Sequence, residues 1–222
     1  IYLDYNITSA NEIRVPVDRD VSIDLVSLDV IHSFWVPKLA GKKDIIPNND
    51  NKTWFRAEET GTFQGQCAEF CGIAHALMKF SVIVETEKEF DQWIVSQQAV
   101  PSTPQTYLAQ EGYGLFASKG CATCHTVSGP DLDSTREVRH QLFLNGVTTT
   151  HAPNLTHFAT RETFAGGIMD NTQENLEEWL NDPEDVKPGN RMARLAQVYN
   201  NPELELTQSD ISALVAYLQS LE

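Results

Sequence analysis

Apolar and polar residues alternate with a period of two through much of the first part of the chain. Such alternation predicts short strands with one buried face, and Gly61 and Gly65 are expected to interrupt them. Several short strands separated by Gly, Pro and Asn turns indicate an all-β sandwich or barrel. The expected strands lie within residues 11–17, 20–27, 53–66 and 79–86, and the first two place Ile13, Val15, Val17, Val21, Ile23 and Leu25 inward.

From residue 87 onward the spacing of apolar residues changes from two to that of a helix. Residues 87–97 place Phe90, Trp93 and Ile94 on one side, which predicts a short helix that closes the first domain. Residues 106–120, 172–182 and 206–222 continue the helical pattern, and Thr207 is the expected N-cap of the last helix. The expected buried positions are Leu176, Trp179, Leu180, Ile211, Leu214, Val215 and Leu218.

A connector separates the two patterns. Residues 97–105, QQAVPSTPQ, contain two prolines, small polar residues and no charge, as is typical of an extended linker. We therefore expect a β domain at residues 1–96, a linker at 97–105 and a helical domain at 106–222.

Composition narrows the function classes. An apolar content of 41% supports packed cores, and no run approaches the roughly 18 apolar residues that a membrane span needs. The chain starts at Ile1 without an initiator methionine or a signal peptide, so we expect a processed or trimmed fragment. The net charge is −15 and both domains are acidic, which argues against a nucleic-acid partner. This charge indicates either a solvated acidic surface or a field that steers a basic protein.

Four soft or borderline donors are crowded into GQCAEFCGIAHALMKF, residues 65–80. Cys67, Cys71, His75 and Met78 favour copper, since zinc has little use for a thioether. A blue copper site needs only one cysteine, so the second cysteine requires another explanation. Two thiolates four residues apart can bridge two metals, and His32 in IHSFWVP, at the end of an expected strand, is the best further ligand. The alternatives are a disulfide or buried thiols, and a core histidine at position 32.

The other two cysteines form CATCH, residues 121–125. C-x-x-C-H is the attachment motif of c-type haem. Cys121 and Cys124 are expected to form thioethers, and His125 to bind the iron. A redox dithiol is the alternative, but it leaves His125 without a role.

IHSFWVP, KKDIIP and GQCAEFCGIAHALM resemble subunit II of haem–copper cytochrome oxidases. The resemblance implies a cupredoxin β-barrel with a dinuclear copper A centre of two coppers. It also implies that the Glu69 side chain faces a magnesium site shared with the catalytic subunit, although an exposed loop carboxylate is the alternative. The implied copper ligands are His32, Cys67, the carbonyl of Glu69, Cys71, His75 and Met78.

Residues 106–222 resemble the cytochrome c domain fused to subunit II in caa-type oxidases, most closely over 154–192. By this resemblance the proline carbonyl that orients His125 belongs to Pro153, with Pro130 as the rival. The sixth iron ligand is Met192 in KPGNRM, where Ala193 replaces the family's usual proline, and Met169 packs beside the haem. Residues 128–151 look like an insertion, and His140, His151 and His157 are expected at the surface or in it.

Together these features predict the subunit through which electrons enter a terminal oxidase, passing from haem to copper A and on to the catalytic subunit I. The donor would be a cytochrome c, a bc-type complex or another quinol-oxidising complex. The resemblance implies a soluble fragment from the outer face of a bacterial cytoplasmic membrane, held there by an N-terminal anchor. The chain itself has no oxygen-reducing site. A copper-delivery module or a haem sensor is the alternative, whereas a nitrous oxide reductase needs more than the six histidines present.

Overall fold

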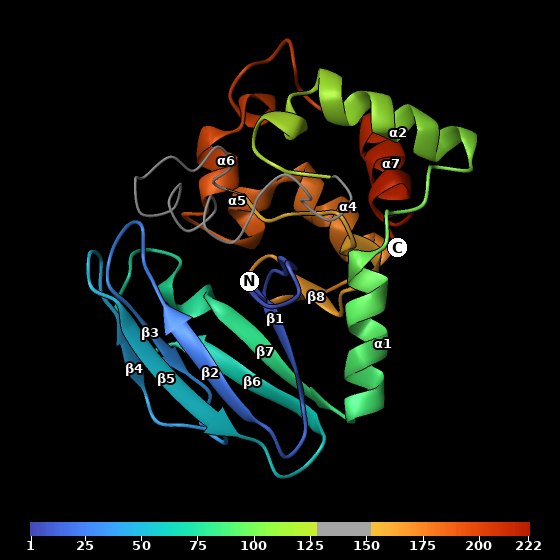
Figure 1. Cartoon of the computed structure of the whole chain (residues 1–222). Helices are drawn as coiled ribbons and strands as arrows, with labels where there is room; N and C mark the ends of the chain where they lie inside the picture. The colour runs from blue at the N-terminus through green and yellow to red at the C-terminus, as the bar shows by residue number, and fades with distance from the viewer. Residues whose placement is uncertain (128–151) are drawn as a thin grey trace. The chain divides into compact units, whose positions relative to one another are not determined.

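The computed structural model describes residues 1–127 and 152–222 (Figure 1). It divides into two compact units. One unit consists of Ser9–Ser96 with Gly166–Ile168, and the other consists of Ile1–Thr8, Gln97–Ala165 and Met169–Glu222. A β-rich unit followed by a helical unit confirms the predicted fold class.

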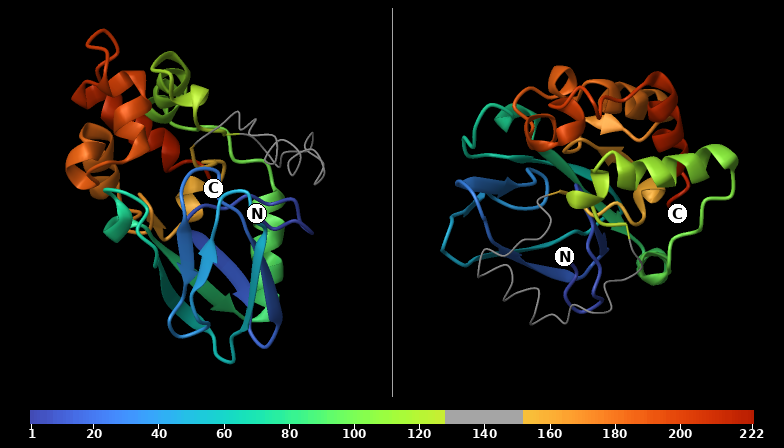
Figure 2. Two further views of the ribbon diagram at one scale, coloured as in Figure 1. Left: turned by 90° about the vertical axis from the view of Figure 1, so that its left-hand side faces the viewer. Right: turned by 90° about the horizontal axis from the view of Figure 1, so that it is seen from above.

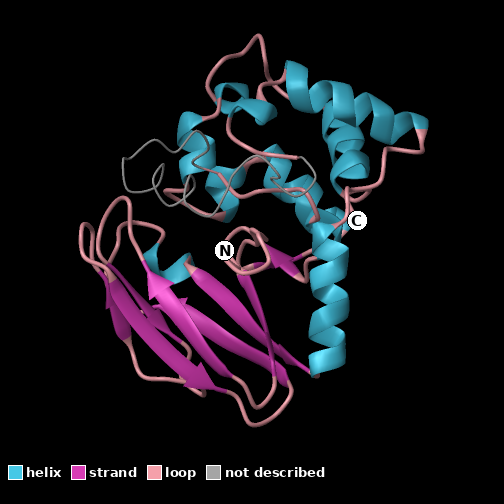
Figure 3. Ribbon diagram, in the orientation of Figure 1, coloured by secondary structure: helices cyan, strands magenta, loops and turns pink. Residues whose placement is uncertain are grey.

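The β-rich unit is built from a five-stranded sheet and a separate antiparallel pair (Figure 3). The sheet has the order β1-β7-β6-β3-β4, in which β1 and β7 are parallel and the other pairs antiparallel. Strands β2 and β5 form the pair. The strands are β1 (Glu12–Pro16), β2 (Asp20–Leu25), β3 (His32–Trp35), β4 (Lys43–Ile45), β5 (Asn51–Arg56), β6 (Gly61–Cys67) and β7 (Lys79–Glu85).

The core of this unit forms where the apolar faces of the strands meet. The alternating positions predicted from β1 and β2 do pack on this core, with Val15 and Leu25 fully buried. The other buried members come from the remaining strands and the turns that follow them. They are Phe34, Val36, Phe55, Ala57, Phe63, Val82 and Val84.

Two predicted strand boundaries are wrong. Gly65 does not interrupt a strand but lies inside β6, where it leaves room for the ring of Phe80, because a Cβ there would come within 2.4 Å of that ring. His32 begins β3 rather than ending a strand. The preceding residues form a loop in which the Ser27 hydroxyl donates to the carbonyl of Val30 at 2.6 Å, so pairing starts only afterwards.

The predicted closing helix is α1 (Glu87–Gln98), which buries Phe90 and Ile94. Its first turn is capped by Thr86, whose hydroxyl accepts from the backbone N–H of Glu89 at 3.3 Å. The Glu89 carboxylate in turn accepts from the N–H of Thr86 at 2.9 Å. This reciprocal pair fixes where the helix starts. Helical structure continues to Gln98, two residues into the segment predicted as a linker.

The helical unit packs α2 (Tyr107–Ser118) across α7 (Gln208–Leu218), as Figures 1 and 2 show. Gly112 allows the close approach, since a Cβ there would lie 1.9 Å from the carbonyl oxygen of Ala213. The rings of Tyr113 and Phe116 meet Tyr217 edge-on at 5.6 and 5.5 Å. The described remainder comprises α4 (Gln173–Asn181), α5 (Pro183–Val186), α6 (Arg191–Leu195), the short turns η2 (Cys121–Thr123), η3 (Phe158–Thr160) and η4 (Gln197–Tyr199), and a two-residue ladder of β8 (Thr163–Phe164) with β9 (Met169–Asp170).

The predicted helical faces are confirmed. Leu176 and Leu180 of α4 are buried, Trp179 packs beside them, and the four predicted positions of α7 are all buried. Thr207 is the N-cap of α7 and forms a capping box with Asp210. Among the described residues, no helix combines the length and apolar character that crossing a bilayer requires.

Candidate metal centres

The first donor cluster forms at one end of the sheet. Strand β6 ends at Cys67, and its partner β3 begins at His32, so the antiparallel register brings these two side chains together. The Cys67 Sγ lies 3.8 Å from Nδ1 of His32 and 3.7 Å from Sγ of Cys71. The ligand atoms of these three residues all lie within 4.8 Å of one another.

The loop between β6 and β7 supplies the remaining donors. Its ends are joined by a hydrogen bond from the N–H of Cys67 to the carbonyl of Met78, at 2.9 Å. The turn η1 (His75–Leu77) places Nδ1 of His75 3.5 Å from Sγ of Cys71, and Sδ of Met78 lies 3.8 Å from the same sulfur. The carbonyl oxygen of Glu69 lies 3.2 Å from Sγ of Cys67. The other four predicted donors therefore surround the two cysteine sulfurs.

Asp29 is a member of this site that sequence reasoning missed. Its carboxylate lies 2.9 Å from Nε2 of His32, which leaves Nδ1 facing the sulfur of Cys67. Burial is the largest influence on His32 and disfavours its charged form, but the hydrogen bonds to Asp29 and Cys67 outweigh it and raise the pKa. A carboxylate behind a ligating imidazole orients the ring and increases its basicity. The only signal in the sequence was that Asp29 lies three residues before His32, close enough for the two side chains to meet.

The two thiols differ in acidity. Burial raises both pKa values and is the largest influence on each. At Cys67, hydrogen bonds from the backbone at Glu69 and Ser33 and from His32 outweigh burial and lower the pKa to about 7. At Cys71 the neighbouring Cys67 adds to the effect of burial and raises the pKa to about 11. The two thiols therefore lie in different surroundings, with the hydrogen-bond donors gathered at Cys67.

Two thiols, two imidazole Nδ1 atoms, a thioether and a carbonyl in one cluster suit a soft, borderline metal such as copper. The cluster has too many sulfur donors for a mononuclear blue copper site, so the donor set fits a copper pair. The Glu69 side chain is exposed. The described side chains do not test its predicted magnesium role.

The second donor cluster follows α2. Gly120 adopts φ +82°, which turns the chain into η2, and the N–H of His125 donates to the carbonyl of Cys121 at 2.9 Å. The Thr123 hydroxyl donates to the carbonyl of Gly120 at 2.6 Å and closes the same turn. Cys121, Cys124 and His125 thus lie in one compact turn. A haem held by both cysteines and by His125 requires such close spacing.

His125 is oriented by Pro153. Its Nδ1 lies 2.8 Å from the carbonyl of Pro153, and because a carbonyl only accepts, Nδ1 carries the proton and Nε2 is left to bind a metal. Burial lowers the pKa of His125, with Arg161 also lowering it and the Pro153 hydrogen bond opposing. The Pro153 turn is itself held by Asn154, whose Oδ1 accepts from the N–H of Thr156 at 2.8 Å. The rival Pro130 lies outside the described residues.

The two candidate methionines lie in different elements. Met192 is in α6 and Met169 in β9, and both pack, partly buried, against the apolar core of the helical unit. The choice of Met192 as sixth ligand stays a prediction.

His157 is not a surface residue, contrary to the prediction. It is 5% exposed, because Leu155 and Phe158 on either side of it pack in the core of the helical unit. Neither of its ring nitrogens has a hydrogen-bond partner in the described structure. His140 and His151, like the rest of the predicted insertion at 128–151, lie outside the described residues.

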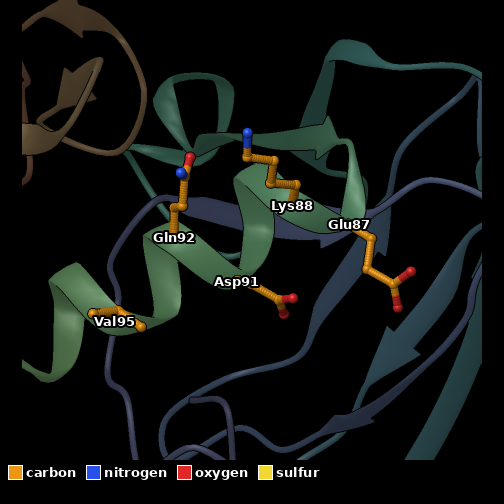
Figure 4. Close-up of a pocket in the computed structure, with 5 residues that line it drawn as sticks. All are labelled: Glu87, Lys88, Asp91, Gln92 and Val95. Carbon is orange, nitrogen blue, oxygen red and sulfur yellow. The ribbon is translucent and has the colours of Figure 1, made fainter.

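The outer face of α1 carries a hollow of about 660 Å³ that contributes to neither cluster (Figure 4). Its lining comes from one helix and offers no sulfur or imidazole donor. The lining residues are Glu87, Lys88, Asp91, Gln92 and Val95.

Comparison with known proteins separates the same two parts of the chain. Residues 5–87 match the family described as cytochrome c oxidase subunit II, periplasmic domain, and residues 109–222 match the cytochrome c family. The whole chain is 36% identical to the cytochrome c oxidase subunit 2 of Alkalihalophilus pseudofirmus, 38% to that of Bacillus sp. strain PS3 and 36% to that of Bacillus subtilis. It spans 57%, 58% and 58% of those relatives' own lengths, respectively.

Proposed function

The chain belongs to the cytochrome c oxidase subunit II family, in the caa-type form that carries a cytochrome c domain, and we propose that it is the subunit through which electrons enter a terminal haem–copper oxidase. The electron would be accepted in the cytochrome c domain, passed to the copper A domain and delivered to the catalytic subunit I. The observation that carries this proposal is the cluster around Cys67 and Cys71, whose sulfurs lie 3.7 Å apart with imidazole and thioether donors beside them.

We propose that Cys67 and Cys71 would hold a pair of coppers. His32, His75, Met78 and the Glu69 carbonyl complete the ligand set. In the helical unit, Cys121 and Cys124 would attach a haem c through their sulfurs, and His125 and Met192 would hold its iron, with Pro153 orienting His125. When bound, the copper pair and the haem iron supply reversible one-electron chemistry.

The task of the chain's own residues is to hold these donors nearly still. His32 and Cys67 are fixed by the register of β3 and β6, and the loop that carries Cys71, His75 and Met78 is closed by a backbone hydrogen bond. Asp29 fixes the ring of His32 in the same way that Pro153 fixes the ring of His125. Donors held by rigid elements and by hydrogen bonds change little between oxidation states, which favours fast electron transfer.

The proposal extends to the surroundings of the chain. A donor cytochrome c, or a bc-type or equivalent quinol-oxidising complex, would meet the acidic surface, and the exposed Glu69 carboxylate would face a magnesium ion shared with subunit I. The protein would work at the outer face of a bacterial cytoplasmic membrane. The domain boundaries at 96/97 and 105/106 are part of the same proposal.

Cofactor content and spectra of the purified protein test the assignment. We expect two coppers and one covalently bound haem c per chain, and an electron paramagnetic resonance signal from one unpaired electron shared by two equivalent coppers. One copper per chain with an isolated copper(II) signal would instead support a copper-delivery module. Haem without any copper would leave a haem-binding sensor as the better reading.

A further inference from the structure

The helix that carries Met192 is too short to be stable without contacts to the rest of the unit. α6 has five residues, and helices of this length gain too few internal hydrogen bonds to offset the cost of starting them. Their free backbone groups must be satisfied from outside the helix. Two asparagine side chains meet this need, one at each end.

Asn190 holds the N-terminal end. Its Oδ1 accepts from the N–H of Ala193 at 2.8 Å, which makes it the N-cap. Its Nδ2 donates backwards to the carbonyls of Pro183 at 2.6 Å and Lys187 at 2.9 Å. The side chain is 8% exposed, and it joins α6 to the neighbouring α5, which lies beside it in Figure 1.

Asn200 holds the C-terminal end. Its Nδ2 lies 2.9 Å from the carbonyl oxygen of Ala193 and 2.8 Å from that of Ala196, so its two N–H groups satisfy two carbonyls at the end of α6. The segment that carries Asn200 is anchored in turn. Val198 is buried, and the hydroxyl of Tyr199 donates to the carbonyl of Leu180 at the end of α4, at 3.1 Å.

We propose that Asn190 and Asn200 form a clamp, acting as positioning residues that hold Met192 at the haem iron. The inference rests on the proposed function, in which Met192 is the sixth ligand. Methionine binds iron(III) weakly, so the ligand is retained only while its helix stays in place. Loosening either end of α6 favours states in which the methionine has left, and an external ligand can then bind the iron.

Imidazole titration of the oxidised full-length protein measures this directly, by loss of the sulfur-to-iron(III) absorption band. Asn200→Ala removes two hydrogen bonds at the helix end, and we expect about tenfold tighter imidazole binding, equivalent to about 1.4 kcal/mol. Asn200→Asp directs carboxylate oxygens at the same carbonyls and should have a larger effect. Asn200 is exposed, so neither variant disturbs the core.

Asn201→Ala is the matched control. Asn201 adjoins Asn200, but its side chain accepts from the N–H of Glu203 at 3.1 Å. We expect its imidazole affinity to equal that of the unaltered protein. Equal affinities for Asn200→Ala, Asn200→Asp and Asn201→Ala would overturn the clamp.

Two further variants separate failure of the clamp from failure of the ligand assignment. Met192→Ala should abolish the absorption band in the absence of imidazole, and Met169→Ala should retain it. The reverse result would show that Met192 is not the ligand and would overturn both proposals. A band lost only in Met192→Ala, with no response in the Asn200 variants, would overturn the clamp alone.

Discussion

Replacing Gly112 with alanine tests the crossing of α2 and α7, where α2 is the helix that leads into the CATCH turn. A Cβ at this position would lie 1.9 Å from the carbonyl oxygen and 2.6 Å from the carbonyl carbon of Ala213, and 2.8 Å from Cβ of Tyr217. Non-bonded carbon atoms prefer separations of about 3.5 to 4.0 Å. The nearest atoms belong to backbone rather than to a flexible side chain, so the helices themselves must separate.

Overpacking of this kind costs about 1 to 3 kcal/mol, and the backbone contacts place Gly112→Ala at the upper end. Alanine regains about 1 kcal/mol through its better helix propensity. The net loss is therefore about 2 kcal/mol, which corresponds to a fall in Tm of about 8 °C for a domain of this size.

Thermal unfolding of the full chain with haem bound, followed by the main haem absorption band, reports on the helical unit alone. Gly114→Ala is the matched control in the same helix, because a Cβ there meets nothing within 4 Å. We expect Gly114→Ala to raise Tm slightly and Gly112→Ala to lower it by about 8 °C. Equal Tm values for the two variants would refute the close approach of α2 and α7.

Three further predictions follow from the charges and donors. Cys71→Ser should abolish the paired copper signal but leave the haem spectrum unchanged, because the two donor clusters lie in separate units; loss of both signals would contradict this. A hydrogen bond from the backbone N–H of Thr207, and next the hydrogen bond from Lys119, lower the pKa of the Asp210 carboxyl group. The stability that this carboxylate contributes is therefore present above its pKa in the unfolded chain, and it is lost as the pH falls through its pKa in the folded protein. In urea unfolding at pH 6, the free energy of unfolding of the unaltered protein should exceed that of Asp210→Asn by up to about 1 kcal/mol, as for a carboxylate near a helix N-terminus. This difference should narrow toward pH 3, and a constant difference would refute the reasoning. Reduction by a basic cytochrome c should slow at least about tenfold between 0.01 and 0.1 M salt, since the Debye length falls from about 30 to about 10 Å; a flat profile would exclude steering by the acidic surface.

Local signals predicted most of the elements. In β1 and β2 the two-residue period predicts which face is buried, and in α4 and α7 the apolar stripe does so. Thr207 could be predicted as the start of α7 because its capping hydrogen bond spans only three residues. The cysteine motifs identified most of the proposed ligands in the same way, because all but His32 and Met192 lie within one loop or turn.

Features that depend on distant partners were missed. Strand β4 has one apolar residue in three, and only pairing with β3 makes it a strand. From the sequence alone Gly65 indicates the end of a strand, and only the ring of Phe80 packed against it explains a glycine inside the strand. His157 lies among polar and aromatic neighbours in the sequence, and tertiary packing alone buries it. The bonds of Asn200 span up to seven residues and follow no motif.

The central claim is that one chain accepts an electron at its haem and passes it to its own copper centre. The most direct test is flash reduction of the oxidised full-length protein, carrying haem and copper, by less than one equivalent of a photogenerated reductant. We predict that the haem absorption of the reduced form appears first and then decays, while the copper absorption bleaches with the same first-order rate constant at every protein concentration. A rate that rises in proportion to protein concentration, or a haem that stays reduced beside oxidised copper, would contradict the account.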